Sequence, residues 1–144
     1  MSMHIAKVLS KWHGSFNGKG VVQAAEFATT VSLPIEFGGL GQGASPEDLF
    51  LSAIASCYII TLGIVLDKAG VKHHSLEVDG KLLTKTGPAS SIEEILLNVS
   101  LTTDSPQATI ESLAARVNDH CLIGKAIRAD LKKTVRIVCL NKAN

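Results

Sequence analysis

The fold is decided by residues 45–70, which read SPEDLFLSAIASCYIITLGIVLDKAG. Ser45 suits the N-cap of a helix, Pro46 suits its first position, and the two acids that follow are favourable in a first turn. The apolar run behind them ends at Gly70, a residue typical of the position just after a helix. We therefore predict a long helix from Pro46 to about Ala69.

This helix also raises the question of a membrane. The run from Leu49 to Leu66 is uncharged over eighteen residues, which is the length of a candidate membrane span. Small and polar residues interrupt the run, and no basic cluster flanks it. We therefore expect no membrane association, and we predict instead a helix that is buried on nearly all sides, in the core or in a subunit interface.

Strand patterns lie on both sides of the helix. Before it, Asn17-Gly18 is a turn signal between two apolar segments, and after it Gly87-Pro88 separates two alternating segments. The predicted strands are Ile5–Trp12, Gly20–Phe27, Thr29–Leu33, Val71–Thr84, 95–101 and Thr134–Leu140.

A second helix is predicted to open at Ser105-Pro106, with its apolar face at Ile110, Leu113, Ala114 and Val117. Cys121 follows four residues after Val117, so it would project from the same face if the helix continued that far. The order is a hairpin, a long helix, a second hairpin, a helix and a closing strand. This order predicts an α+β fold rather than a βαβ series.

Composition sets further limits. Of the 144 residues, 46% are hydrophobic and 19% are charged, and the net charge is +1. These values are typical of a folded chain of one domain, residues 1–144. Because basic stripes are absent and aromatic residues are few, we expect no nucleic-acid partner. The start of the chain lacks the pattern of a signal peptide, so we expect a cytoplasmic protein.

The three cysteines are the candidates for chemistry. Cys57 lies in the middle of the most apolar helix, where a free cysteine is commonly a packing residue. Cys121 lies near a predicted helix end, beside His120. From the residues alone, packing and reactivity both remain open for these two, whereas Cys139 fits the core face of a strand. No CxxC or HxxxH spacing is present, which predicts no metal site and disfavours a general disulfide oxidoreductase.

Two motifs resemble one family. Ser45-Pro46-Glu47-Asp48-Leu49-Phe50, followed by Ala53-Ile-Ala-Ser-Cys57, resembles the "NPEELL…A…AC" start of the central helix in the OsmC/Ohr proteins. These are the osmotically induced and organic-hydroperoxide-resistance proteins. Cys121-Leu-Ile-Gly-Lys-Ala-Ile127 resembles their "CP-x-S-x-A-L" segment, and 34–39 resembles the stretch before the helix in the Ohr branch. The similarity extends over nearly the whole chain in matching order.

The resemblance implies a thiol-dependent peroxidase. In it Cys57 would attack a hydroperoxide and become a sulfenic acid, and Cys121 would resolve this acid by forming a disulfide. Glu47 would belong to the ion pair that activates the thiolate. No cofactor is implied, but an external thiol reductant is needed: a lipoyl protein, thioredoxin or glutathione. The implied fold is an intertwined homodimer.

The sequence departs from the family in two places. No arginine precedes Cys57, and Phe16 occupies the position of the activating arginine of the Ohr branch. Lys19 lies near that position and is the candidate activating cation, although it lacks the fork of an arginine. Leu122 replaces the proline that follows the resolving cysteine. The missing arginine favours an alternative, in which the protein binds a small apolar molecule with weak or no peroxidase activity.

Helix geometry supports the dimer independently. Glu47 and Cys57 are ten residues apart, which places them about 15 Å apart along one helix axis. They cannot touch within one straight helix. Two antiparallel copies of the helix would bring Glu47 of one chain near Cys57 of the other, so we predict a site built across the dimer.

Overall fold

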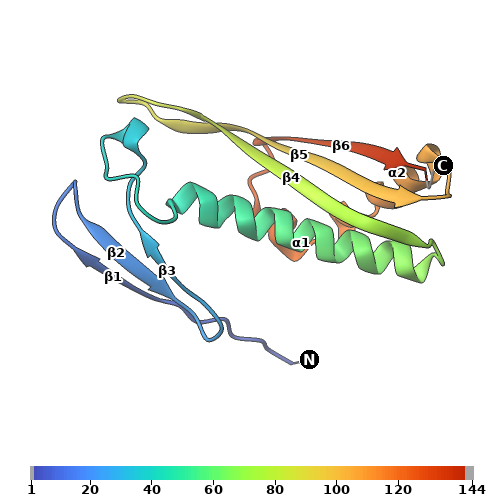
Figure 1. Ribbon diagram of the computed structural model, residues 1–144, viewed down its shortest axis with the longest axis horizontal. Helices are drawn as coiled ribbons and strands as arrows, with labels where there is room; N and C mark the ends of the chain where they lie inside the picture. Colours follow the sequence, from blue (N-terminus) through green and yellow to red (C-terminus); the bar gives the residue numbers. More distant parts are fainter. Residues whose placement is uncertain (1, 142–144) are drawn as a thin grey trace. The chain divides into compact units, whose positions relative to one another are not determined.

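The computed structural model describes residues 2–141, and the chain forms two compact units. The N-terminal unit comprises Met1–Phe50 with Thr86–Pro88, and the C-terminal unit comprises Leu51–Lys85 with the chain from Ala89 onward. Figure 1 shows the elements in chain order.

The N-terminal unit contains an antiparallel sheet of order β1-β2-β3. Its strands are β1 (Leu9–His13), β2 (Lys19–Gln23) and β3 (Ala28–Val31), and the 3-10 helix η1 (Ile35–Phe37) follows them. The predicted hairpin is therefore confirmed, but its strands are shorter than expected. A turn joins β1 to β2, and a side chain at Gly18 would lie 2.4 Å from the His13 carbonyl oxygen, so only glycine fits there.

The start of the long helix α1 (Pro46–Lys68) is fixed by reciprocal capping. The Ser45 N–H donates to Asp48 Oδ2 at 2.8 Å, and the Asp48 N–H donates to Ser45 Oγ at 3.1 Å. These two backbone N–H groups have no acceptor within the helix, and the two side chains supply one for each. The predicted start at Pro46 is confirmed, and the predicted end is within one residue.

The C-terminal unit packs α1 against a sheet of order β4-β5-β6, as Figure 1 shows. Its strands are β4 (His73–Lys85), β5 (Ser91–Thr103) and β6 (Lys132–Leu140). Alternate residues of β5 form the core layer under α1, because the side chains of a strand alternate between its two faces. This buried set comprises Ile95, Leu97, Val99 and Leu101 from β5, with Ile54, Tyr58, Leu62, Val65 and Leu66 from α1.

β5 and β6 are parallel, so the chain must cross over between them. Three short helices make this crossover: α2 (Gln107–Ala115), α3 (Val117–His120) and α4 (Leu122–Ala126). The second predicted helix does not continue to Cys121, since α2 ends at Ala115, so the condition for placing Cys121 on its apolar face is not met. Cys121 is nevertheless fully buried, because the chain folds back into the core between α3 and α4.

One expectation for α1 is also corrected. The helix is long and apolar enough to cross a membrane by length and composition. Within this chain it is buried along one face, whereas Ile60 is 62% and Ile64 is 50% exposed on another. The helix is thus not buried on nearly all sides in the core of this chain. The subunit interface remains as the predicted cover for the exposed face.

Candidate active site: a cysteine pair

The structure brings Cys57 and Cys121 into direct contact. Cys57 lies midway along α1, and Cys121 lies between α3 and α4 in the crossover. The Cys121 thiol donates a hydrogen bond to Cys57 Sγ at 3.0 Å, and both cysteines are free. Residues 64 positions apart therefore hold two sulfurs at a distance from which a disulfide can form with little movement.

Local backbone geometry holds each thiol. Cys121 is extended (φ −74°, ψ 103°), and its N–H donates to the Val117 carbonyl at 2.8 Å. The Gly124 N–H donates to Cys121 Sγ at 3.3 Å, so the sulfur caps α4. On α1, the Thr61 hydroxyl donates to the Cys57 carbonyl at 2.7 Å.

The two thiols have pKa values shifted in opposite directions. Burial raises the pKa of Cys57, but the Cys121 thiol, the Ile123 backbone, the Thr61 hydroxyl and the Leu122 backbone together bring it below its ordinary value. Polar hydrogens near the sulfur, first of all the thiol proton of Cys121, favour its charged form. A cation is therefore not the only means of lowering this pKa.

Cys121 has a raised pKa. Burial is the main cause, and the hydrogen bond that Cys121 donates to Cys57 adds to it. The Gly124 N–H and the charge of Lys133 act in the opposite direction. The arrangement favours a thiolate at Cys57 and a protonated thiol at Cys121, which is the division of states that a nucleophile and a resolving thiol need.

Lys133 is a residue near the pair that the sequence interpretation missed. It lies on β6, and its Nζ is 5.4 Å from the centroid of the Tyr58 ring. The predicted strand began at Thr134, two residues after the observed start of β6 at Lys132. Extending the alternation of Val135 and Ile137 back by one step would have placed Lys133 on their core-facing side.

The other predicted site residues lie in the N-terminal unit. Glu47 is in the first turn of α1, and its Oε2 is buried without a hydrogen-bond partner among residues 2–141. Lys19 is the exposed first residue of β2, paired in register with His13. The C-terminal unit by itself supplies both thiols, and the roles of Glu47 and Lys19 remain predictions.

Cys139 differs from the pair. It is half-buried on β6 at the edge of the core, in line with its predicted place. Burial and the charge of Glu111 raise its pKa, and its N–H donates to Gln107 Oε1 at 2.9 Å. It is a free cysteine among the described residues and packs against the core, so we assign it to packing.

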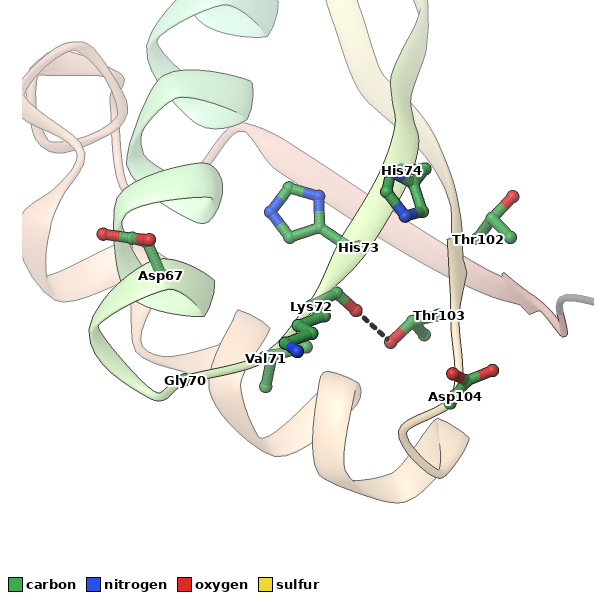
Figure 2. Close-up of a pocket in the computed structure, with 9 residues that line it drawn as sticks. All are labelled: Asp67, Gly70, Val71, Lys72, His73, His74, Thr102, Thr103 and Asp104. Carbon is green, nitrogen blue, oxygen red and sulfur yellow. Dashed lines mark hydrogen bonds between the residues drawn. The ribbon is translucent and has the colours of Figure 1, made fainter.

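Several hollows lie in the C-terminal unit, and two of them are next to α1 residues outside the cysteine pair. One of about 490 Å³ adjoins the end of the helix, and Figure 2 shows its lining, including His73, His74, Asp67 and Asp104. Within residues 2–141 no group of three His, Cys, Asp or Glu side chains is arranged to hold a metal ion. Another hollow, of about 430 Å³, is lined by Thr61, Lys68, Arg116 and His120; Thr61 lies one turn after Cys57 on α1, and His120 directly precedes Cys121.

Comparisons with known proteins agree with this architecture. The family model of OsmC-like proteins matches residues 39–136, so this chain belongs to the OsmC-like protein family. An uncharacterised Bacillus subtilis protein, YmaD, is 27% identical over 138 residues, which cover 92% of both chains.

Solved structures show the same fold. An organic hydroperoxide resistance protein from Elizabethkingia anophelis has a TM-score of 0.79 at 18% identity and covers 96% of this chain and all of its own. The Organic Hydroperoxide Resistance Protein OhrB of Bacillus subtilis has a TM-score of 0.73 at 20% identity, covering 95% of this chain and all of its own. The α+β, OsmC-like fold predicted from the sequence is confirmed.

Proposed function

We propose that this protein is a thiol-dependent peroxidase that reduces organic hydroperoxides through Cys57 and Cys121. The observation that carries the proposal is the contact of the two sulfurs at 3.0 Å, with the pKa of Cys57 lowered and that of Cys121 raised. Membership of the OsmC-like family and the names of the hydroperoxide resistance proteins with the same fold support it.

The chemistry balances with these two residues and one reductant. The Cys57 thiolate attacks the outer oxygen of the hydroperoxide, the O–O bond breaks, and the alkoxide leaves with a proton as an alcohol. Cys121 then attacks the sulfur of the Cys57 sulfenic acid, and water leaves. A thiol reductant reopens the disulfide. We propose a cytoplasmic protein without a metal or organic cofactor, served by a lipoyl protein, thioredoxin or glutathione.

We further propose that the working form is a homodimer. The exposed apolar face of α1, with Ile60 and Ile64, supports this because such a surface is costly to leave in water. The buried and unpaired Oε2 of Glu47 supports a site that needs another group, in this proposal from the second chain.

A mixed dimer tests this arrangement. One chain carries Glu47→Ala and the other carries Cys57→Ser, so that Glu47 and Cys57 remain intact on different chains. In the trans model one composite site of the mixed dimer keeps both groups, and peroxidase activity returns to about half per dimer. Activity no higher than that of the two parent dimers would contradict the trans model.

Mass spectrometry tests the reaction itself. We treat the reduced protein with one equivalent of cumene hydroperoxide and follow the intact mass and the cysteine-containing peptides. We expect rapid formation of a Cys57–Cys121 disulfide, a stable sulfenic acid in Cys121→Ser, and no reaction in Cys57→Ser. Cys139→Ser is the matched control and should react like the unchanged protein.

Alkylation as a function of pH provides a second measurement. Because the pKa of Cys57 is lowered and that of Cys139 is raised, iodoacetamide should label Cys57 first near neutral pH. The labelling rate of Cys57 should fall as the pH drops through its lowered pKa. If Cys57 is labelled no faster than Cys139 and oxidises slowly, the peroxidase proposal fails.

The alternative is a small-molecule-binding protein of the OsmC fold. The 430 Å³ hollow beside Thr61 favours it, since this volume lies within the range of small-ligand sites. The peroxide experiment separates the two proposals: slow oxidation together with protection of Cys57 from alkylation by a small apolar compound would favour the binding protein.

A further inference from the structure

Lys133 occupies an unusual position for a charged residue. It is half-buried on the core-facing side of β6, opposite Ile95 of β5 in the parallel register and in line with Val135 and Ile137. Lysine is seldom placed at such a position without a partner, because burying a charge is costly unless it is compensated. The surroundings of the ammonium group should therefore contain its counter-charge.

No carboxylate fills this role in the part of the chain that the structure describes. The ion pairs there join Arg128 to Asp130 and Lys132 to Glu94, and neither includes Lys133. The ammonium instead lies 5.4 Å from the centroid of the Tyr58 ring, a cation–π contact that stabilises a desolvated cation but adds no negative charge.

The sulfur of Cys121 lies near the same ammonium, beside Gly124. A Cβ on Gly124 would lie 3.2 Å from Cys121 Sγ and 3.6 Å from Lys133 Nζ. The sulfur and the ammonium thus both border the space that the missing side chain of glycine leaves, and no side chain of Gly124 separates them. This cation acts on the pKa of Cys121 and is not among the groups that act on Cys57. The group available as a counter-charge for Lys133 is therefore the Cys121 thiolate.

We propose that Lys133 is the positioning cation of the resolving thiol, stabilising the Cys121 thiolate whenever the pair exchanges its disulfide. This inference rests on the disulfide chemistry proposed above. Once Cys57 is a sulfenic acid, Cys121 loses the thiolate to which it donated a hydrogen bond. Lys133 and the Gly124 N–H then stabilise the anion as it attacks Cys57 sulfur. The S–O bond breaks, and the departing hydroxide takes the proton of Cys121 to form water.

The same cation assists the reverse exchange. Cys121 is fully buried whereas Cys57 is only half-buried, so a dithiol reductant attacks the sulfur of Cys57. The S–S bond breaks, and Cys121 leaves as a thiolate facing Lys133. A lower pKa of the leaving thiol speeds this step. The second thiol of the reductant then displaces Cys57 from the mixed disulfide, and the reductant ends as a disulfide.

The pH dependence of disulfide formation and of disulfide reduction tests the role of Lys133. The groups that face Cys121 are Cys57 and Tyr58 on α1, the Gly124 N–H on α4 and Lys133 on β6. We compare the unchanged protein with Lys133→Met, Lys133→Gln and Lys133→Arg. The control is Lys132→Met, which removes the adjacent, exposed lysine of the same strand.

The first measurement is the rate at which the Cys57 sulfenic acid converts to the disulfide between pH 5.5 and 9, after one equivalent of cumene hydroperoxide. In Lys133→Met and Lys133→Gln we expect a rate roughly three- to tenfold lower at pH 7 and a profile displaced to higher pH. Lys133→Arg should restore the profile, and Lys132→Met should leave it unchanged.

The second measurement needs no peroxide. The disulfide is formed with diamide, and its reduction by dithiothreitol is followed. Loss of Lys133 should slow the reduction roughly threefold or more, because Cys121 becomes a poorer leaving group. Suppose that loss of Lys133 slows the reduction by dithiothreitol, but neither the unchanged protein nor any variant reacts with peroxide. The peroxidase proposal then fails, and the role of Lys133 stands.

Two results would overturn the inference on Lys133. The first is that Lys133→Met and Lys133→Gln both retain the pH profile and reduction rate of the unchanged protein. The second is that they slow both steps at every pH without displacing the profile, and that Lys133→Arg does not restore the rates. The second result would mean that Lys133 acts only in packing.

Discussion

Tyr58 is the single tyrosine of the chain, so ultraviolet absorbance reports its ionisation directly. Burial and the nearby charge of Cys121 raise its pKa to about 12. We expect the tyrosinate band of the folded protein to appear with a midpoint near this value. The same protein in guanidinium should titrate near pH 10, the ordinary value of a tyrosine. A folded midpoint near 10 would contradict the burial of the ring beside the thiols.

The raised pKa of Tyr58 also makes the free energy of unfolding depend on pH. The pKa of Tyr58 is raised by folding, so the unfolded chain loses this proton at a lower pH than the folded chain. The contribution to the free energy of unfolding is fully present below about pH 10 and is lost as the pH rises toward 12. Urea unfolding at several pH values, with Tyr58→Phe for comparison, measures it.

At the scale of single elements, the start of α1 depends on the capping pair. Ser45→Ala removes the acceptor for the Asp48 N–H, and we expect the free energy of unfolding to fall by about 1 kcal/mol. Asp48→Ala should have a similar effect, and the double variant should lose less than the sum because the two bonds form one unit. Ser112→Ala, an exposed serine on α2, is the control.

If Ser45→Ala and Ser112→Ala had equal effects in urea unfolding, the capping bonds would contribute nothing to stability. Such a result would also remove the physical reason for beginning the helix at Pro46.

The elements differ in how far the sequence predicts them. The α1 boundaries follow from local chemistry, namely a cap, a proline and a closing glycine, and the core row of β5 follows from strict alternation. The break at Arg116 was not predictable, because α2 carries no glycine or proline that would end it at this point. The parallel pairing of β6 depends on tertiary packing, which no local pattern encodes.

The candidate site likewise combines features that the sequence predicts with features that depend on tertiary packing. The positions of Cys57 and Cys121 came from family motifs, whereas their contact depends on the crossover folding back onto α1. Lys133 was missed because the start of β6 lies among lysines that resemble a solvated loop. The influence of the Leu122 and Ile123 backbones on the pKa of Cys57 could not be inferred, since main-chain groups have no sequence signature.

For the whole molecule, the proposed dimer makes a specific prediction. Ile60→Glu places a charge on the exposed face of α1, where a second copy would cover it. We expect sedimentation velocity to show a dimer for the unchanged protein and mainly a monomer for this variant. Val138→Glu, at a position that is 55% exposed on β6, is the control and should remain dimeric. A monomeric unchanged protein would exclude the dimer.

The contact between α1 and the crossover also has a thermodynamic consequence. A bond between Cys57 and Cys121 closes a loop of 64 residues, and restricting the unfolded chain in this way is worth about 4 kcal/mol. The oxidised protein should therefore melt at a higher temperature than the reduced protein or Cys121→Ser, as calorimetry can measure. By linkage, the fold favours the disulfide by the same free energy as the disulfide favours the fold. A reductant must overcome this mutual stabilisation at each turnover, so a substitution that destabilises the oxidised fold more than the reduced fold should also make the pair easier to reduce.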